Sequence, residues 1–154
     1  MTHAPTTRTR RVLARAAAGV LLSGGLLAGT VVPAQAAPPG AAVLDVADDY
    51  LGTPYRYGGT TPAGFDCSGY TQFVLGRLGV PLPRTADAQL RASHRISAAQ
   101  AAPGDLVFFT SGSGRAYHVA IYAGNGRILD SPRAGRVVSE RNIWTSAVVY
   151  GRVA

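Results

Sequence analysis

The sequence has no lysine and only one cysteine, one methionine and one tryptophan among its 154 residues. A lone cysteine, Cys67, cannot form a disulfide within the chain, so it is either a small buried apolar residue or a reactive thiol. The chain also lacks any Cys-x-x-Cys or His-x-x-x-His pair, which are the usual spacings of zinc ligands. We therefore expect no metal site.

Strong charge is missing once the N-terminus is set aside. All 15 basic residues are arginine, against 8 acidic residues, for a net charge of +7. Four of these arginines precede residue 37, which leaves 11 against 8, or +3, for the rest of the chain. This mild, scattered charge argues against a nucleic-acid partner and is compatible with peripheral association with an anionic bacterial envelope. We expect a monomer.

The longest apolar run, residues 16–32, follows a basic start and precedes the small-residue sequence Ala34-Gln35-Ala36. This order is typical of a secretory signal peptide. The run is rich in glycine and only moderately hydrophobic, which makes a membrane anchor the weaker alternative. We predict a signal peptide over 1–36, a short linker over 37–42, and one catalytic domain over 43–154 that is secreted to the cell wall or medium.

Helical patterns come first in this domain and strand patterns follow. Apolar residues recur at three and four positions over 41–52 and 66–79, and a shorter helix is predicted over 84–93. Short runs rich in Val, Ile, Tyr and Phe then alternate with Gly, Pro and Ser, at 105–110, 117–124, 126–131, 136–139 and 147–153. This order predicts an α+β fold with an antiparallel sheet of about five strands.

Cys67 lies where the second predicted helix begins. Asp66 is well placed as its N-cap, and the amides and dipole of the first turn would stabilise a thiolate. The Asp66 charge opposes this effect, so an activating base is still needed. His118 lies inside a strand pattern and is the candidate, whereas His94 lies in a polar stretch and is given no role.

A hairpin is predicted around Asn125-Gly126, and its loop length decides where Asp130 points. A two-residue loop would place Asp130 opposite Ile121, on the face away from His118. A three-residue loop, 124–126, would place it opposite Ala120, on the same face as His118. We predict the three-residue loop, because a carboxylate beside the imidazole could orient it and stabilise its charged form.

Four stretches in the same order resemble the NlpC/P60 cysteine peptidases of bacterial cell walls. They are "GTPYRYGGTTPAGFDCSGYTQFVL", "LPRTADAQ", "PGDLVFF" and "HVAIYAGNGRILDSPRAG". The resemblance implies a papain-like α+β fold, in which the nucleophilic cysteine starts a helix packed on an antiparallel sheet that supplies the histidine. Matched position by position, it implies that Cys67 is the nucleophile, His118 the general base and Asp130 the third catalytic residue, a position that is often His in the family.

The resemblance also implies residues that contact substrate. Tyr55 matches a tyrosine that helps to bind the oxyanion, and Asp66 and Ser68 match residues that recognise the free amine of a stem peptide. Tyr57 falls where the family has an aromatic residue for packing, so we expect it in the core. Arg84 is either structural or substrate-facing.

The activity that the resemblance implies is hydrolysis of peptidoglycan stem peptides, at the bond from γ-D-glutamate to a diamino acid, through an acyl-enzyme and without a metal or organic cofactor. Three alternatives remain open from the residues. The same thiol could serve another amidase or acyltransferase, the protein could be an antibacterial effector, or the fold could be an inactive wall-binding scaffold.

Overall fold

A computed structural model describes residues 36–153. The predicted signal peptide, 1–36, lies outside this range except for its last residue. Three α-helices and one 3₁₀ helix are present in it: α1 (Gly40–Asp48), α2 (Cys67–Arg77), α3 (Ala86–Ala92) and η1 (Ala98–Gln100). Within the described range, no helix has both the length and the apolarity needed to cross a membrane.

The helices lie where they were predicted, but the first one has different ends. It starts at Gly40, inside the stretch that was predicted to be a linker, and it ends at Asp48, short of Gly52. The chain turns after Asp48 through local hydrogen bonds from Tyr50 to Ala47 and from Leu51 to Asp48, and the amide of Gly52 then donates to the carbonyl of Val138 at 2.9 Å. A positive φ of 83° at Gly52 makes this change of direction possible.

Six strands form one antiparallel sheet in the order β3-β8-β4-β5-β6-β7, and two more form a separate hairpin. The strands are β1 (Thr60–Thr61), β2 (Gly64–Phe65), β3 (His94–Ile96), β4 (Leu106–Thr110), β5 (Ala116–Gly124), β6 (Arg127–Asp130), β7 (Ser139–Asn142) and β8 (Val148–Arg152). The α+β class is confirmed, with one strand more in the sheet than expected. Strand β3 was missed because it is polar, and β7 begins at Ser139, where the predicted strand 136–139 ends.

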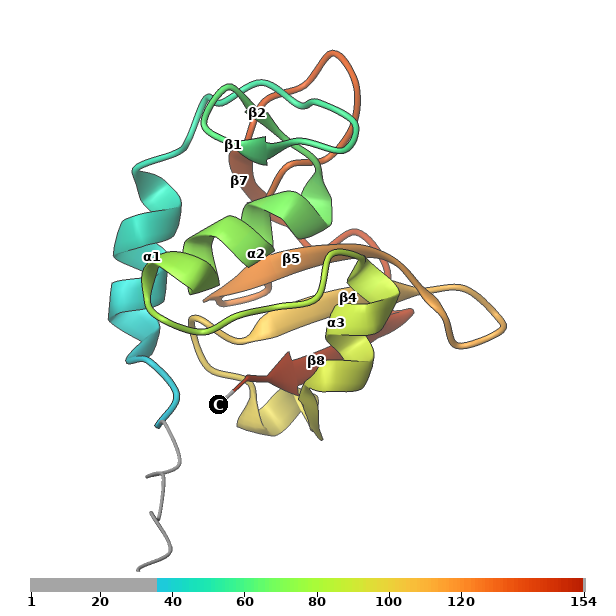
Figure 1. The fold of residues 1–154 in the computed structure, drawn as a ribbon. Coiled ribbons are helices and arrows are strands. Elements are labelled where there is room, and N and C mark those ends of the chain that lie inside the picture. The colour runs from blue at the N-terminus through green and yellow to red at the C-terminus, as the bar shows by residue number, and fades with distance from the viewer. Residues whose placement is uncertain (1–35, 154) are drawn as a thin grey trace, which may run out of the picture. The chain divides into compact units, whose positions relative to one another are not determined.

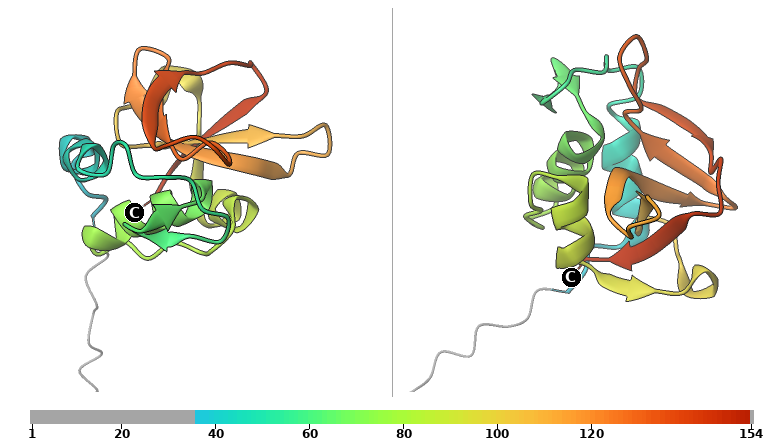
Figure 2. Two further views of the ribbon diagram at one scale, coloured as in Figure 1. Left: turned by 90° about the horizontal axis from the view of Figure 1, so that it is seen from above. Right: turned by 90° about the vertical axis from the view of Figure 1, so that its right-hand side faces the viewer.

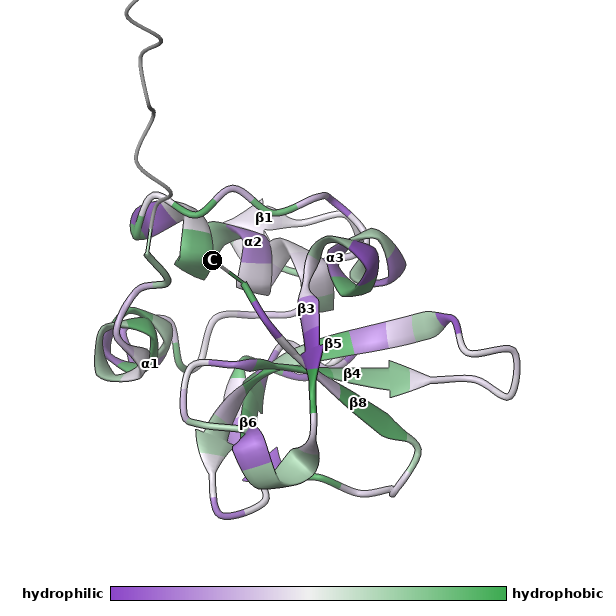
Figure 3. Cartoon of the chain, turned by 90° about the horizontal axis from the view of Figure 1, so that it is seen from below, coloured by the Kyte–Doolittle hydropathy of each residue, from purple (hydrophilic) through white to green (hydrophobic). Residues whose placement is uncertain are grey.

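The helices α2 and α3 lie together on one face of the sheet, over β5 (Figures 1 and 2). Side chains alternate between faces along β5, so Val119 and Ile121 join the core beneath the helices, and Ala120 joins a second cluster on the opposite face. Strands β4 and β8 are hydrophobic over most of their length, whereas β3 is hydrophilic (Figure 3). The catalytic candidates on β5 and β6 are therefore held by strands that are packed on both sides.

The β5–β6 hairpin has a shorter loop than predicted, but Asp130 has the predicted register relative to β5. Gly124 pairs with Arg127, so the loop has two residues, Asn125 and Gly126, and the three-residue prediction is wrong. Both loop residues have positive φ, 51° and 72°, as a type I′ turn requires. However, the register shifts by one residue between Tyr122 and Gly124, which is a β-bulge.

The bulge cancels the effect of the shorter loop. Beyond it, Leu129 pairs with Ile121, so the next residue, Asp130, falls on the face of Ala120 and His118. The carboxylate therefore lies on the predicted face, but the β-bulge places it there and not the predicted three-residue loop.

Candidate active site

Cys67 is the first residue of α2, and its side chain is half-buried. Asp66 caps the helix as predicted, because its Oδ1 atom accepts the Gly69 amide at 2.8 Å. The thiol therefore lies at the positive end of the helix, among amides that favour an anion. The helix supplies position and part of the electrostatic stabilisation, but no base.

The start of α2 is pressed against the turn that precedes β1. The Asp66 amide donates to the Gly59 carbonyl at 3.1 Å, and the Gly58 amide donates to Asp66 Oδ2 at 2.9 Å. A Cβ atom on Gly69 would lie only 1.9 Å from the Gly59 oxygen, so this position requires glycine. The glycine of the "DCSG" motif thus serves a close backbone approach that fixes the first turn of the helix.

His118 and Asp130 form a buried pair. His118 Nε2 lies 2.6 Å from Asp130 Oδ2, and the two residues are 7% and 0% exposed. Burial alone would lower the pKa of His118, but Asp130 and the neighbouring Cys67 side chain outweigh it and raise the pKa to about 9. Because Nε2 is engaged by Asp130, Nδ1 is the ring nitrogen left for the thiol.

Arg141 is a second partner of Asp130 that the sequence did not reveal. Its Nε atom donates to Asp130 Oδ1 at 2.8 Å, and its Nη2 atom donates to Oδ2. Burial favours a neutral carboxyl, but Arg141 and His118 overcome it and lower the pKa of Asp130. Arg141 comes from β7, whose polar sequence carries no strand alternation that would have placed it on this face.

The Arg141 side chain rests on a stack of aromatic rings. Its Cζ atom lies 4.2 Å from the centre of the Trp144 ring, and that ring stacks on Phe109 with centroids 3.8 Å apart. Phe109 pairs with His118 across β4 and β5. The stack therefore fixes Arg141, and through it Asp130, against the strand that bears the histidine.

On the other side of Cys67 lies a polar cluster that is centred on Asp66. Arg84 Nη1 donates to Asp66 Oδ1 and to Ser68 Oγ, each at 3.0 Å. Tyr55 is near enough for burial, and then Asp66 and Cys67, to raise the pKa of its hydroxyl, so the phenol remains a proton donor at neutral pH. Arg84 thus has a structural role, because it holds the Asp66 side chain in place.

Tyr57 is 90% exposed, so the expectation that it packs in the core is wrong.

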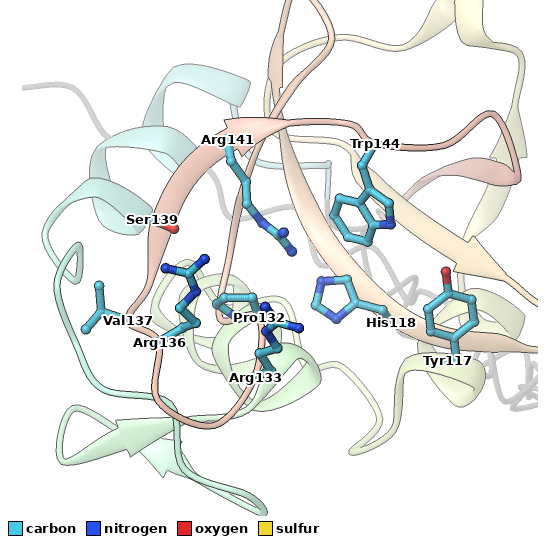
Figure 4. A pocket seen from close by; sticks show the side chains of 9 residues that line it. All are labelled: Tyr117, His118, Pro132, Arg133, Arg136, Val137, Ser139, Arg141 and Trp144. Atoms are coloured by element: carbon cyan, nitrogen blue, oxygen red, sulfur yellow. The ribbon is translucent and has the colours of Figure 1, made fainter.

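A cavity of about 660 Å³ opens beside His118 (Figure 4). Its lining residues come from β5, β7, the loop between β6 and β7, and the segment after β7: Tyr117, His118, Pro132, Arg133, Arg136, Val137, Ser139, Arg141 and Trp144. Tyr117 and Trp144 lie on one side of His118 in this view, Arg136 lies on the other side, and Arg133 lies between Arg136 and His118. The cavity can therefore hold part of a ligand against the imidazole.

The structure thus brings Cys67, His118 and Asp130 together, and it gathers Tyr55, Asp66 and Ser68 beside the thiol. Among residues 36–153, no three His, Cys, Asp or Glu side chains are grouped so that they could hold a metal ion. A half-buried thiol, a protonated imidazole and a buried carboxylate are the groups that nucleophilic acyl transfer requires.

Comparison with known proteins identifies the family. A model of the NlpC/P60 family matches residues 52–152. The chain belongs to the NlpC/P60 family. Among curated NlpC/P60 relatives, the probable endopeptidase p60 of Listeria monocytogenes is 48% identical over 116 residues, which are 72% of this chain and 23% of that protein.

A second relative is the bifunctional muramidase/DL-endopeptidase CwlT of Bacillus subtilis, 43% identical over 117 residues, which are 72% of this chain and 36% of that protein. Among solved structures, the NlpC/p60 domain of the peptidoglycan hydrolase SagA matches with a TM-score of 0.68 and 38% identity, over 76% of this chain and 100% of that one. This chain thus spans between about a quarter and a third of the two curated relatives, and it corresponds to the whole of the solved domain. The resemblance to the NlpC/P60 family that the four sequence stretches indicated is confirmed.

Proposed function

We propose that the protein is a cysteine endopeptidase that hydrolyses peptidoglycan stem peptides between γ-D-glutamate and the diamino acid. The observation that carries this proposal is the buried His118–Asp130 pair beside a thiol at the start of α2. The names of the relatives, endopeptidases and a peptidoglycan hydrolase, support the substrate class.

The proposed reaction begins with a thiolate–imidazolium pair. With a pKa of about 9, His118 is protonated at neutral pH while the Cys67 thiolate attacks the γ-carbonyl carbon. The tetrahedral oxyanion is bound by a backbone amide at the start of α2 and by the Tyr55 hydroxyl. His118 then gives its proton to the leaving amine, so the C–N bond breaks and a thioester remains on Cys67.

Water completes the cycle. His118, now neutral, takes a proton from a water molecule that attacks the thioester carbonyl, the C–S bond breaks, and the acid leaves with Cys67 as a thiolate and His118 still protonated, which restores the starting pair. Asp130 keeps Nε2 engaged throughout, which holds the ring in one orientation and stabilises its charged form. The proposed steps use only groups of this chain and require no metal or organic cofactor.

The acyl half of the substrate would lie against the Asp66 cluster. In the proposal, Tyr55, Asp66 and Ser68 bind the free amine and the adjacent peptide of the stem. Arg84 holds both Asp66 oxygens and Ser68 Oγ, so the carboxylate is fixed before substrate arrives. This gives the acyl half a polar, pre-organised site next to the nucleophile.

We also propose that the protein acts outside the cytoplasm. The basic start, the apolar run and the Ala34-Gln35-Ala36 sequence support export. If residues 1–36 are removed, the protein recovered from culture medium begins at Ala37, which intact-mass measurement would show. A medium protein that still carries these residues would contradict the proposed cleavage.

The test of the proposed activity is the digestion of purified peptidoglycan, with wild-type protein and Cys67→Ala compared by mass analysis of the fragments. We expect new γ-glutamyl ends and free diamino-acid amines from the wild type alone. Fragments released instead at the bond between sugar and peptide would point to an amidase. Unchanged muropeptides from both proteins would overturn the proposal for that peptidoglycan.

A further inference from the structure

The cavity beside His118 carries an excess of positive charge. Three of its nine lining residues are arginines, Arg133, Arg136 and Arg141, and no Asp or Glu lines it. The charge of Arg141 is matched by Asp130. Within residues 36–153, no carboxylate forms an ion pair with Arg133 or Arg136.

The loop that bears these two arginines is fastened to the rest of the site. Ser131 Oγ donates to the Phe65 carbonyl at 2.7 Å, next to the helix cap. The Tyr55 amide donates to the Arg136 carbonyl at 2.8 Å, and the Arg136 amide donates to the Arg133 carbonyl at 3.1 Å. Both guanidinium groups therefore project from a backbone that is tied to the segment of the proposed oxyanion donor.

The position of the cavity relates it to one half of the substrate. His118, which gives its proton to the leaving amine in the proposed reaction, lines the cavity. Cys67, Tyr55 and Asp66 do not line it, and in the proposed function the cluster they form binds the acyl half. The group that enters the cavity is therefore the leaving half, the diamino acid and whatever follows it.

We propose that Arg133 and Arg136 form a subsite for a carboxylate on the leaving half of the stem peptide. This inference rests on the proposed function and adds a specificity to it. Lysine and meso-diaminopimelate both end in an ammonium group, but only diaminopimelate has a side-chain carboxylate next to it. Two guanidinium groups repel the ammonium and bind the carboxylate, so the pair separates the two diamino acids.

Two carboxylates of the leaving half could occupy this subsite. One is the side-chain carboxylate of the diamino acid, and the other is the free α-carboxylate when the peptide ends there. Both present the same chemistry to the arginines. Four soluble tripeptides, L-Ala-γ-D-Glu-X, separate the two sources: X is diaminopimelate, its side-chain amide, its α-amide, or lysine.

The experiment measures kcat/KM for each tripeptide with wild type, Arg133→Gln, Arg136→Gln and the double variant. For a side-chain source, we expect the wild type to cleave the diaminopimelate peptide about tenfold faster than the side-chain amide and the lysine peptide, as two partly exposed charge pairs allow. The double variant should bring this ratio close to one. Arg95→Gln, an exposed arginine on β3 outside the cavity, is the matched control and should keep the wild-type ratio.

Each outcome decides the inference. If the wild type cleaves the side-chain amide more slowly than the diaminopimelate peptide, the side-chain carboxylate occupies the subsite. If it cleaves the α-amide more slowly, the α-carboxylate does. Either result supports the subsite when the double variant abolishes the difference. Equal cleavage of all four peptides by wild type, or a preference that survives in the double variant, overturns the subsite alone. Cleavage of none of the four overturns the proposed function, and the inference with it.

Discussion

Asp130 has no contact with solvent, and its Oδ2 atom is shared between His118 and Arg141. A buried carboxylate with a single partner would be expensive to keep ionised, and two cationic partners with hydrogen bonds reduce that expense. The ionised carboxylate in turn keeps the imidazole protonated in a site where burial alone would favour the neutral ring. The charge of Asp130 is thus what connects the stability of this strand pair with the proposed chemistry.

The pH profile of kcat/KM should report this connection. The account places its basic limb near pH 9, where His118 loses the proton that the leaving amine needs. Asp130→Asn removes one cause of the raised pKa, so the limb should move to lower pH, and kcat/KM should fall roughly 10²–10⁴-fold.

Asp105→Asn is the matched control. Asp105 is also a buried carboxylate held by an arginine, Arg152, but it lies outside the site, so its loss should leave the basic limb in place. A limb that does not move in Asp130→Asn would show that the carboxylate only fills space.

The role of Asp66 can be separated into capping and substrate binding. Asn is as good an N-cap as Asp, so Asp66→Asn keeps the cap on α2 but removes the negative charge. If Asp66 binds the free amine, the wild type should prefer a free over an acetylated stem peptide, and the variant should lose about tenfold of that preference in kcat/KM. An unchanged ratio between the two peptides would reduce Asp66 to a cap and a partner of Arg84.

For single residues, the sequence predicted a role correctly where that role depends on residues close by in the chain. The Asp66 cap followed from its place before an apolar helical run, and the structure has it. Tyr57 was expected in the core, but the chain turns at Gly58, with φ of 73°, and leaves the ring exposed. The contact between Arg141 and Asp130 could not be predicted, because the two residues are 11 positions apart and meet only through the register of the β6–β7 pair.

Among the elements, the β6–β7 pair offers two ion pairs that differ mainly in burial. Arg141–Asp130 is closed off on the carboxylate side, whereas both side chains of Arg127–Glu140 are about two-fifths exposed. Surface pairs contribute less than about 1 kcal/mol, while the removal of one partner from a buried pair costs about 3–5 kcal/mol. The two pairs should therefore respond differently to acid.

Arg141→Gln should raise the pH at which the protein unfolds in acid. The lowered pKa of Asp130 adds stability above its ordinary value of 3.8, and that stability is lost as the pH falls through the folded value. Without Arg141, burial has less opposition, the carboxyl takes up its proton at higher pH, and the transition moves up. Circular dichroism during acid titration would show this, with Arg127→Gln as the control that unfolds where the wild type does. Coincident transitions for both variants would contradict the assignment.

The β5–β6 hairpin shows the limit of reading register from sequence. Asn125-Gly126 identifies a tight turn, and both loop lengths that we considered use it. The bulge that sets the final register has Gly124 at a φ of 92°, a conformation that glycine permits but does not require. The local sequence therefore allows several registers, and packing of β5 and β6 in the sheet selects among them.

At the scale of the whole molecule, the order of helices and strands was predictable because the apolar period changes after Pro103-Gly104. The order of strands within the sheet was not, since it depends on pairings such as β4 with β8, which join segments about 40 residues apart. The prediction of a monomer, like that of export, stays a prediction.

The net charge of +3 over residues 37–154 leads to a prediction about the cell wall. If peripheral association depends on charge, retention of Cys67→Ala on anionic wall preparations should fall several-fold between about 0.05 and 0.5 M salt. Co-sedimentation with the wall material would measure this. Retention that does not depend on salt would mean that the substrate cleft, rather than the surface charge, holds the protein.

The central claim is that Cys67 carries the acyl half of a stem peptide during turnover. Rapid acid quenching of wild type with L-Ala-γ-D-Glu-diaminopimelate, followed by mass spectrometry of the peptide that contains Cys67, tests it directly. The account predicts an L-alanyl-γ-D-glutamyl thioester on Cys67, with no diaminopimelate released by Cys67→Ala. An adduct on another side chain, or release of diaminopimelate by Cys67→Ala at the wild-type rate, would contradict it.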